Sequence, residues 1–127
     1  MPQSAPATVL IVDDSVDMRE LLTHLLQSKG YSVNSRTNGE EALELLNSGN
    51  PLPAVILLDL RMPVMDGLNF LELQKKSTLL QNIPVIMMTA EDDLASIKNR
   101  FEIQQILSKP FSMNSVLNAV DRNVILH

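Results

Sequence analysis

Short apolar segments and segments with helical periodicity alternate along the chain. Strands are predicted at residues 8–12, 31–36, 54–58, 84–89 and 104–107. The first, third and fourth of these are the most apolar, as expected of strands that are buried on both faces of a sheet. Helices are predicted around residues 18–26, 39–46, 94–101 and 113–124, and from Gly67 onward. Five successive β/α units predict an α/β domain with a mostly parallel sheet and helices on both faces.

Length and composition narrow the class of protein. The 127 residues correspond to one domain, which we place at residues 8–125 between a flexible N-terminal tail, 1–7, and a C-terminal tail, 126–127. The absence of cysteine excludes thiolate metal sites and fits a reducing cytoplasm. A formal net charge of -5 disfavours direct nucleic acid binding, and no apolar run reaches the roughly 20 residues of a membrane span. We therefore expect a cytoplasmic protein that contacts neither DNA nor a membrane.

Polar residues follow directly on four of the predicted strands. They are Asp13 and Asp14, Asp59, Thr89, and Lys109 with Pro110. Parallel strands end at the same edge of a sheet, where open α/β folds bind their ligands. Carboxylates about 5 Å apart repel by roughly 3 kcal/mol at an effective dielectric near 20, so three ionised carboxylates together cost on the order of 10 kcal/mol. Protonation or cations must offset this repulsion, and oxygen ligands beside one ammonium group predict a Mg²⁺ site.

A carboxylate beside Mg²⁺ can attack phosphorus, and Asp59 is the best placed nucleophile of the set. The Thr89 hydroxyl can donate to one phosphoryl oxygen, and the Lys109 ammonium can pair with another. Both side chains would then sense whether the phosphoryl group is present. The residues thus predict a phosphorylation-dependent switch.

The same residues carry a resemblance to a known family. The chain resembles the receiver domain of bacterial two-component response regulators over about residues 8 to 125. The motifs are Val9-Leu10-Ile11-Val12-Asp13-Asp14, Leu58-Asp59-Leu60-Arg61-Met62-Pro63-Val64-Met65-Asp66-Gly67, Thr89-Ala90 and Lys109-Pro110-Phe111. The resemblance implies a flavodoxin-like, doubly wound (βα)5 fold with strand order 2-1-3-4-5.

The resemblance also implies roles for individual residues. Asp59 would accept a phosphoryl group from a sensor histidine kinase or a histidine phosphotransfer protein. Asp14, Asp59 and the backbone carbonyl of Arg61 would bind Mg²⁺, with Asp13 assisting through water. The peptide bond between Lys109 and Pro110 would be cis, a form that proline tolerates. The domain would catalyse only its own phosphorylation and dephosphorylation and is not expected to be an enzyme in the usual sense.

The chain departs from the family pattern around the predicted fifth strand. Ile106 stands where receivers usually carry an aromatic residue, and residues 91–105 look shortened. An aliphatic side chain has no ring to rotate, so we hypothesise that the signal passes through the loop after Thr89. Ala90 is small and leaves room for a donor imidazole. Arg61 and Glu91 are predicted to pair across the mouth of the pocket and to limit the entry of water.

Several alternatives compete with this interpretation. Asp13 and Asp14 are also suitable caps for the first helix, and Asp66-Gly67 is interpreted as a structural N-cap and permissive glycine outside the site. Met87 and Met88 are expected to pack on opposite faces of the sheet.

The whole domain could instead be a phosphorylation-independent binding module, or an aspartyl-nucleophile phosphatase. Such phosphatases typically place a second aspartate where this chain has Arg61. The downstream protein target is not identified by the sequence.

Overall fold

The computed structural model describes residues 7–90, 93 and 105–125. These residues form five strands: β1 Thr8–Val12, β2 Ser32–Arg36, β3 Val55–Asp59, β4 Val85–Ala90 and β5 Gln105–Lys109. They also form the helices α1 Val16–Ser28, α2 Gly39–Leu46, α3 Gly67–Lys76 and α5 Met113–Ile125. The helix predicted around residues 94–101 lies outside the described residues.

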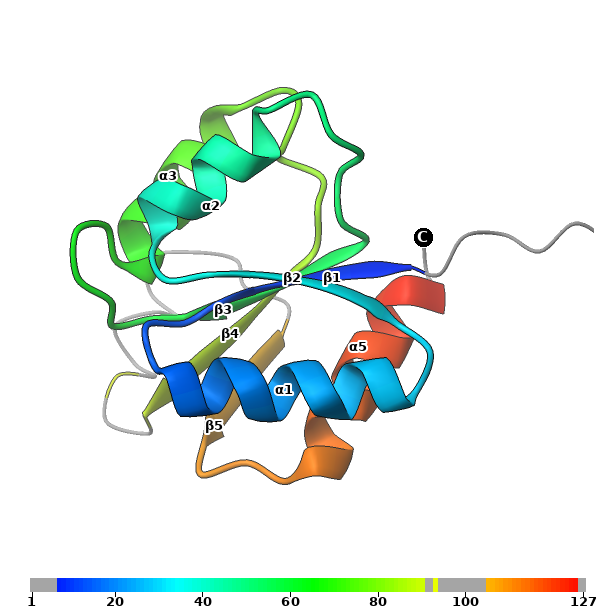
Figure 1. Cartoon of the computed structure of the whole chain (residues 1–127). Coiled ribbons are helices and arrows are strands. Elements are labelled where there is room, and N and C mark those ends of the chain that lie inside the picture. Colours follow the sequence, from blue (N-terminus) through cyan, green and yellow to red (C-terminus); the bar gives the residue numbers. More distant parts are fainter. Residues whose placement is uncertain (1–6, 91–92, 94–104, 126–127) are drawn as a thin grey trace, which may run out of the picture.

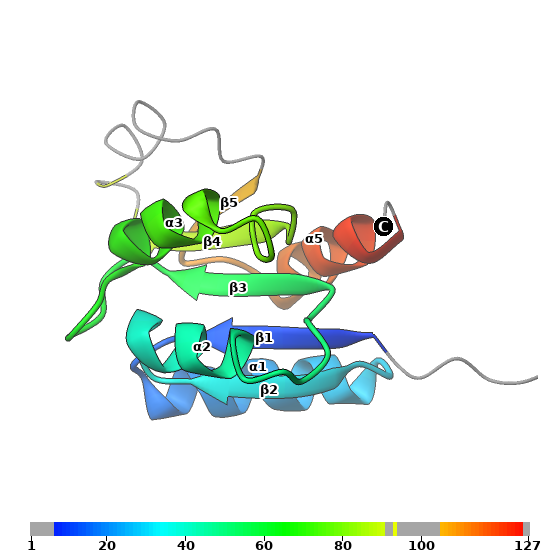
Figure 2. The same ribbon diagram turned by 90° about the horizontal axis from the view of Figure 1, so that it is seen from above.

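The strands form one parallel sheet in the order β2-β1-β3-β4-β5. Figure 1 shows α2 and α3 above this sheet and α1 and α5 below it, and the view from above in Figure 2 shows the strands side by side. The predicted fold class, strand order and two-sided helix cover are therefore confirmed. β5 extends beyond its predicted end because Ser108 and Lys109 continue the ladder opposite Thr89 and Ala90.

The alternation of side chains along each strand builds two cores, one on each face of the sheet. Residues of even number in β1 and β3, such as Leu10 and Ile56, pack against α2 and α3. Their neighbours of odd number, such as Val9 and Leu57, pack against α1 and α5. Met87 lies in the first core and Met88 in the second, so the prediction that they face opposite ways is confirmed.

Local sequence signals fix the ends of the helices. The Asn38 side chain accepts from the Glu41 N–H at 2.9 Å, and the Glu41 carboxylate accepts in return from the Thr37 N–H at 3.0 Å. Gly30 follows α1 with φ 93°, which glycine adopts readily. The N-cap of α1 is Ser15, whose hydroxyl accepts from the Met18 N–H at 3.2 Å. The alternative reading of the acidic pair as helix caps is therefore wrong.

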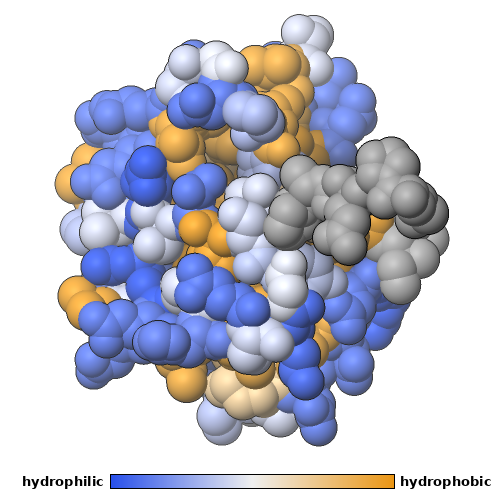
Figure 3. Space-filling view, turned by 45° about the vertical axis from the view of Figure 1, so that its right-hand side comes forward, coloured by the Kyte–Doolittle hydropathy of each residue, from blue (hydrophilic) through white to orange (hydrophobic). Residues whose placement is uncertain are grey.

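The surface carries no large continuous apolar area on the face that Figure 3 shows. That face is mostly hydrophilic, and hydrophobic residues gather in small groups separated by polar ones. None of the helices in the described part of the chain is long and apolar enough to cross a membrane.

Candidate functional site

The carboxyl ends of β1, β3 and β5 bring their polar residues to one edge of the sheet. Asp59 and Lys109 are the last residues of β3 and β5, and Asp13 follows β1 directly. Because side chains alternate along a strand, Asp59 points to the same face of the sheet as Val55 and Leu57. These two residues belong to the core between the sheet and helices α1 and α5. The three side chains therefore reach the same side of the sheet from strands that are distant in sequence.

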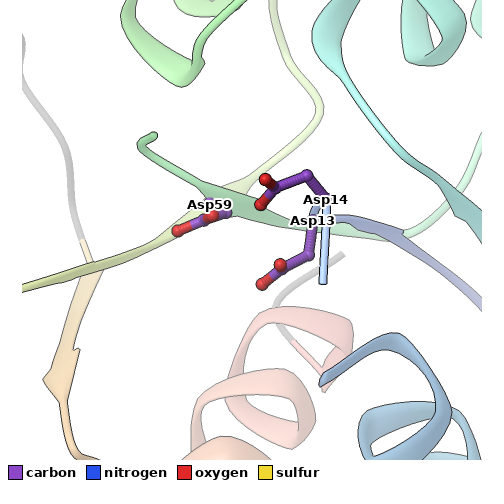
Figure 4. Close-up of side chains that lie close together, drawn as sticks. All are labelled: Asp13, Asp14 and Asp59. Carbon is purple, nitrogen blue, oxygen red and sulfur yellow. The ribbon is translucent and has the colours of Figure 1, made fainter. Parts of the chain in front are cut away.

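Three carboxylates meet at this edge. One oxygen each of Asp13, Asp14 and Asp59 lies within 4.8 Å of the others. Figure 4 shows the carboxylates of Asp13 and Asp14 at the end of β1, close to that of Asp59 from β3. Asp13 and Asp59 are buried, with 1% and 6% of their surface exposed, whereas Asp14 is exposed. The predicted acidic residues thus share one pocket with a single solvent-facing member.

The Asp13 carboxylate is only half satisfied. Its Oδ1 accepts from the Ser15 N–H at 2.9 Å, while its Oδ2 is buried and has no hydrogen-bond partner. The backbone carbonyl of Asp13 accepts from Arg19 Nη1 at 2.7 Å, which fixes the chain at the start of α1. An ionised oxygen left without a partner in a buried place is costly and marks a position where a cation or water is expected.

Lys109 supplies the positive charge of the pocket. Its Nζ lies 3.1 Å from Asp59 Oδ1, and the two side chains are 34% and 8% exposed. The peptide bond between Lys109 and Pro110 is cis. Among the described residues, one ammonium group faces three carboxylates, so the charges of these four side chains add up to a negative total.

Burial and mutual repulsion change the acidity of the pocket. Burial raises the pKa of Asp13 above its usual value, against the Ser15 N–H and the charge of Lys109, which lower it. Burial also raises the pKa of Asp59, the charge of Asp13 raises it further, and Lys109 opposes both effects. A divalent cation would oppose both shifts, because it would stabilise the charged forms.

The donor set fits a hard divalent cation. Every candidate ligand is oxygen, and two of the three carboxylates come from consecutive residues, Asp13 and Asp14. Magnesium prefers oxygen ligands and is often held by one or two carboxylates together with water. The unpartnered Asp13 Oδ2 and the exposed side of Asp14 leave positions for that water.

Thr89 is the last residue but one of β4 and follows Met88, which is paired in register with Asp59. Its side chain is buried, and its hydroxyl donates to the Ala90 carbonyl at 3.3 Å, a long hydrogen bond that can be exchanged for a better acceptor. Ala90 itself is exposed. Ile106 on β5 is half-buried and packs against the core beneath α2 and α3, so it is an ordinary packing residue here.

The start of α3 presses against the backbone of the pocket. A Cβ on Gly67 would lie 2.6 Å from the Asp59 carbonyl oxygen and 3.0 Å from Leu60 Cα, so only glycine fits. From the sequence, we attributed the glycine at position 67 to the conformational freedom that a tight loop needs. Gly67 is not among the described glycines with positive φ, however. The reason for glycine is lack of space. Sequence reasoning excluded Gly67 from the site, although it sets the position of the Asp59 backbone.

The loop between β3 and α3 contains a second constraint. Val64 has φ 67°, which is unusual for a β-branched residue, and the Met65 N–H donates to the Pro63 carbonyl at 2.7 Å around it. The Val64 side chain is 76% exposed. Neither the turn nor its exposed valine was predicted from the sequence, because the sequence signal at this point is only Pro63 before two apolar residues.

Arg61 in the same loop forms an ion pair with Asp93, in the segment that follows β4. Its Nε and Nη2 donate to Asp93 Oδ2 and Oδ1 at 2.9 and 2.6 Å. The predicted partner, Glu91, lies outside the described residues. The hydrogen bonds between the two side chains are the main reason why the pKa of Asp93 is lowered and that of Arg61 is raised. The opposite charge of each partner adds to both shifts. The partner that the structure shows is therefore two residues beyond the predicted one.

The two-sided parallel sheet, with buried carboxylates and a lysine at its carboxyl edge, matches a known family of signalling domains. The model of the family described as "Response regulator receiver domain" matches residues 9–121. The chain belongs to this family and is a receiver domain of two-component signalling.

Individual relatives agree with this assignment. The chain is 34% identical to "Sporulation initiation phosphotransferase F" of Bacillus subtilis, over 90% of each chain. It is 31% identical to part of "Sensor histidine kinase CheAY" of Helicobacter pylori, which matches 93% of this chain but only 15% of that protein. The structure of the chemotaxis response regulator CheY4 of Vibrio cholerae superposes with a TM-score of 0.82, at 31% identity, over 93% of this chain and 98% of that one.

Proposed function

We propose that Asp59 accepts a phosphoryl group and that the domain changes a protein-binding surface in response. The observation that carries the proposal is the Lys109 ammonium 3.1 Å from Asp59 Oδ1, beside two further carboxylates. A lysine in this place holds one oxygen of the nucleophile and leaves the other free. It can also pair with the oxygens of an incoming phosphoryl group.

The chemistry is a transfer between two nucleophiles. One oxygen of the ionised Asp59 carboxylate forms a bond to phosphorus as the bond from phosphorus to a histidine nitrogen of the donor breaks, and the electron pair leaves with the imidazole. Burial and the neighbouring carboxylates raise the pKa of Asp59 and so disfavour its ionised form. Lys109 counteracts the shift, and so keeps the carboxylate available for attack.

The carboxylates of Asp14 and Asp59 and the backbone carbonyl of Arg61 would hold Mg²⁺, with Asp13 acting through a water molecule. The ion would neutralise charge on the carboxylates and on the phosphoryl oxygens. The all-oxygen donor set and the unpartnered Asp13 Oδ2 support this assignment.

Thr89 and Ala90 are suited to detect the product. The hydrogen bond from the Thr89 hydroxyl to the Ala90 carbonyl is long, at 3.3 Å, and therefore weak. The hydroxyl can break it and turn to donate to a phosphoryl oxygen. This movement would be passed on without an aromatic ring at position 106, because Ile106 stands there. We propose that the loop after Thr89 carries the signal instead.

Exposed apolar residues that follow the pocket residues along the chain support a protein as the donor. Val16, at the start of α1, is 56% exposed, and Val64, in the loop after β3, is 76% exposed. Both follow shortly after pocket residues, Asp14 and Asp59. We propose a sensor histidine kinase or a histidine phosphotransfer protein as partner, in keeping with the names of the relatives. The downstream target is a further protein.

The test is the intact mass of the chain after incubation with acetyl phosphate and Mg²⁺. We expect a gain of one phosphoryl group, which chelation of Mg²⁺ or Asp59→Asn abolishes. Asp17→Asn is the matched control, because Asp17 is an exposed aspartate on α1, outside the carboxylate cluster. A wild-type chain that gains no mass with Mg²⁺ present would contradict the proposal and favour a phosphorylation-independent binding module.

The phosphatase alternative is disfavoured by the Arg61 side chain. An aspartyl-nucleophile phosphatase needs a general acid near the nucleophile, and the residue two positions after Asp59 is an arginine that is committed to Asp93. A guanidinium does not release protons at neutral pH. Turnover of a small phosphate ester by the wild-type chain would be the evidence against this conclusion.

A further inference from the structure

We propose that Asp93 is a positioning residue: it holds the Arg61 guanidinium across the edge of the pocket and thereby lengthens the lifetime of the phosphoryl group on Asp59. This inference rests on the proposed function. It assigns a role to a residue that lies four positions beyond Thr89 and outside every motif of the sequence.

The topology places the two partners of the ion pair after neighbouring strands of the sheet. β3 and β4 are neighbours in the sheet, and Asp59 is paired in register with Met88. Arg61 comes two residues after the end of β3, and Asp93 three residues after the end of β4. The ion pair therefore joins the segments that follow two adjacent strand ends, and one of those ends is Asp59.

The geometry of the pair fixes the plane of the guanidinium. Nε and Nη2 each donate to a different oxygen of the Asp93 carboxylate, at 2.9 and 2.6 Å. Two parallel hydrogen bonds restrict rotation of the side chain, whereas a single contact would leave it free. Arg61 would otherwise be a long, mobile side chain, because it is 78% exposed. Asp93, at 16% exposed, is the better anchored partner.

A guanidinium held in this position has a consequence for hydrolysis. Water must approach phosphorus on the side opposite the Asp59 oxygen, which is the outer side of the pocket. A fixed planar cation there occupies part of the approach and orients nearby water as an acceptor, away from phosphorus. Release of Arg61 from Asp93 would open this approach and shorten the lifetime of the phosphorylated chain.

The size of the effect follows from the exposure of the pair. Exposed ion pairs are weak and are screened by salt. The pair is therefore open for part of the time, and its loss changes the decay rate by roughly two- to fivefold, not by orders of magnitude. The same reasoning predicts that added salt shortens the lifetime in the wild type and has little effect once the pair has been removed.

The experiment compares the decay of the phosphoryl mass in the wild type, Asp93→Ala, Arg61→Ala, and the double variant. We expect each single variant to lose the phosphoryl group about two to five times faster, and the double variant to decay no faster than the singles. Raising the salt concentration should shorten the lifetime of the wild type only. Glu44→Ala, which removes an exposed acidic side chain on α2, is the control and should decay as the wild type does.

The outcomes separate this inference from the function on which it rests. A wild-type chain that never gains phosphoryl mass defeats the proposed function. A chain that gains the mass but decays equally fast with and without Asp93 overturns only the role of Asp93. Additive effects of the two substitutions, or a salt dependence that persists in Asp93→Ala, would also overturn it, because they would show that the two residues act separately.

Discussion

Two buried polar regions lie at opposite edges of the sheet, and they differ in a way that separates structure from function. Among the described residues, the buried side-chain oxygens without a partner are Asp13 Oδ2 and Gln74 Oε1. Asp13 lies at the carboxyl edge, after β1, and Gln74 lies near the end of α3, beside the segment that leads into β4. Each breaks the rule that buried polar groups are satisfied, but at very different cost.

The Gln74 region is neutral and local in sequence. The Gln74 Nε2 donates to the carbonyls of Leu80 and Ile83 at 2.8 and 3.1 Å, so one side chain ties the turn before β4 to α3. All of these groups lie within nine positions of one another along the chain. An unpartnered amide oxygen costs far less than an unpartnered charge. This region has no chemistry to perform and serves to shape a turn.

The carboxylate pocket is charged and nonlocal. Its groups come from β1, β3 and β5, and Lys109 meets Asp59 across 50 positions of sequence. A core built only for stability would not gather three carboxylates around one ammonium group, because apolar residues of similar volume would be at least as stable. Buried charge without full compensation, more than burial of polar atoms, therefore marks the functional end of this sheet.

Helix α3 connects the two regions. It begins at Gly67, against the Asp59 backbone, and carries Gln74 near its other end. Its position is therefore fixed by close packing at the pocket and by hydrogen bonds at the turn. Changes at one region can be tested for effects at the other.

Removal of Gln74 should give the largest loss of stability. Gln74→Ala removes both side-chain hydrogen bonds, leaves the Leu80 carbonyl with only the Ile83 N–H as donor, and opens a cavity, so we expect the free energy of unfolding to fall by about 2 to 4 kcal/mol. Urea unfolding measures the change. Gln81→Ala is the control, because Gln81 is exposed, and it should change the stability by less than about 0.5 kcal/mol. A Gln74→Ala variant as stable as this control would remove the structural role assigned to Gln74.

Neutralising Asp13 should have a smaller effect of opposite sign. Asp13→Asn keeps an oxygen for the Ser15 N–H and removes a buried charge that repels Asp59, so we expect a gain of about 1 to 2 kcal/mol in metal-free buffer. Thermal unfolding with and without Mg²⁺ measures it, and Asp17→Asn serves as the exposed control. Loss of stability in the variant without metal would contradict the view that the pocket is strained by its charges.

The smallest effect is a slope of stability with pH. The pKa values of Asp13 and Asp59 are raised in the folded chain, so between their ordinary value, 3.8, and the raised values the folded state binds more protons than the unfolded state. Stability in metal-free buffer should therefore fall as pH rises through that window, by at most about 1.4 kcal/mol per pH unit for each group. Unfolding midpoints from pH 4 upward measure the slope.

The control for the pH slope is the double variant Asp13→Asn, Asp59→Asn, which should lack the contribution of these two groups. Mg²⁺ should also flatten the slope, because a bound cation favours the charged carboxylates. A slope that is the same in the wild type and in the double variant would show that the two carboxyl pKa values are not raised.

The sequence predicts the sheet well, because apolar runs, glycines and helix caps act locally. β1, β3 and β4 coincide with the most apolar segments, and Asn38 and Gly30 bound their helices as expected. The pocket is also predictable, since parallel strands of one sheet must end at one edge. The family motifs add the order of the strands, which no local pattern contains.

What the sequence does not predict depends on packing. Gln74 is a polar residue in a helix, where an exposed position would be expected. It is buried only because the turn before β4 passes over it. The need for Gly67 comes from the distance between α3 and the Asp59 carbonyl, which requires the folded chain. The choice of Asp93 as partner of Arg61 depends in the same way on the course of the chain after β4.

The carboxylates of Asp13, Asp14 and Asp59 are proposed to form a site for one divalent cation. The decisive experiment is a titration of the chain with Mg²⁺, followed by ¹H–¹⁵N correlation spectra. We expect saturable shifts of the amides of residues 13–15 and 59–61, with those around Gln74 unchanged, and loss of these shifts in the double variant Asp13→Asn, Asp14→Asn. Weak, unsaturated shifts spread over exposed acidic residues such as Glu40 and Glu44 would contradict the proposed site.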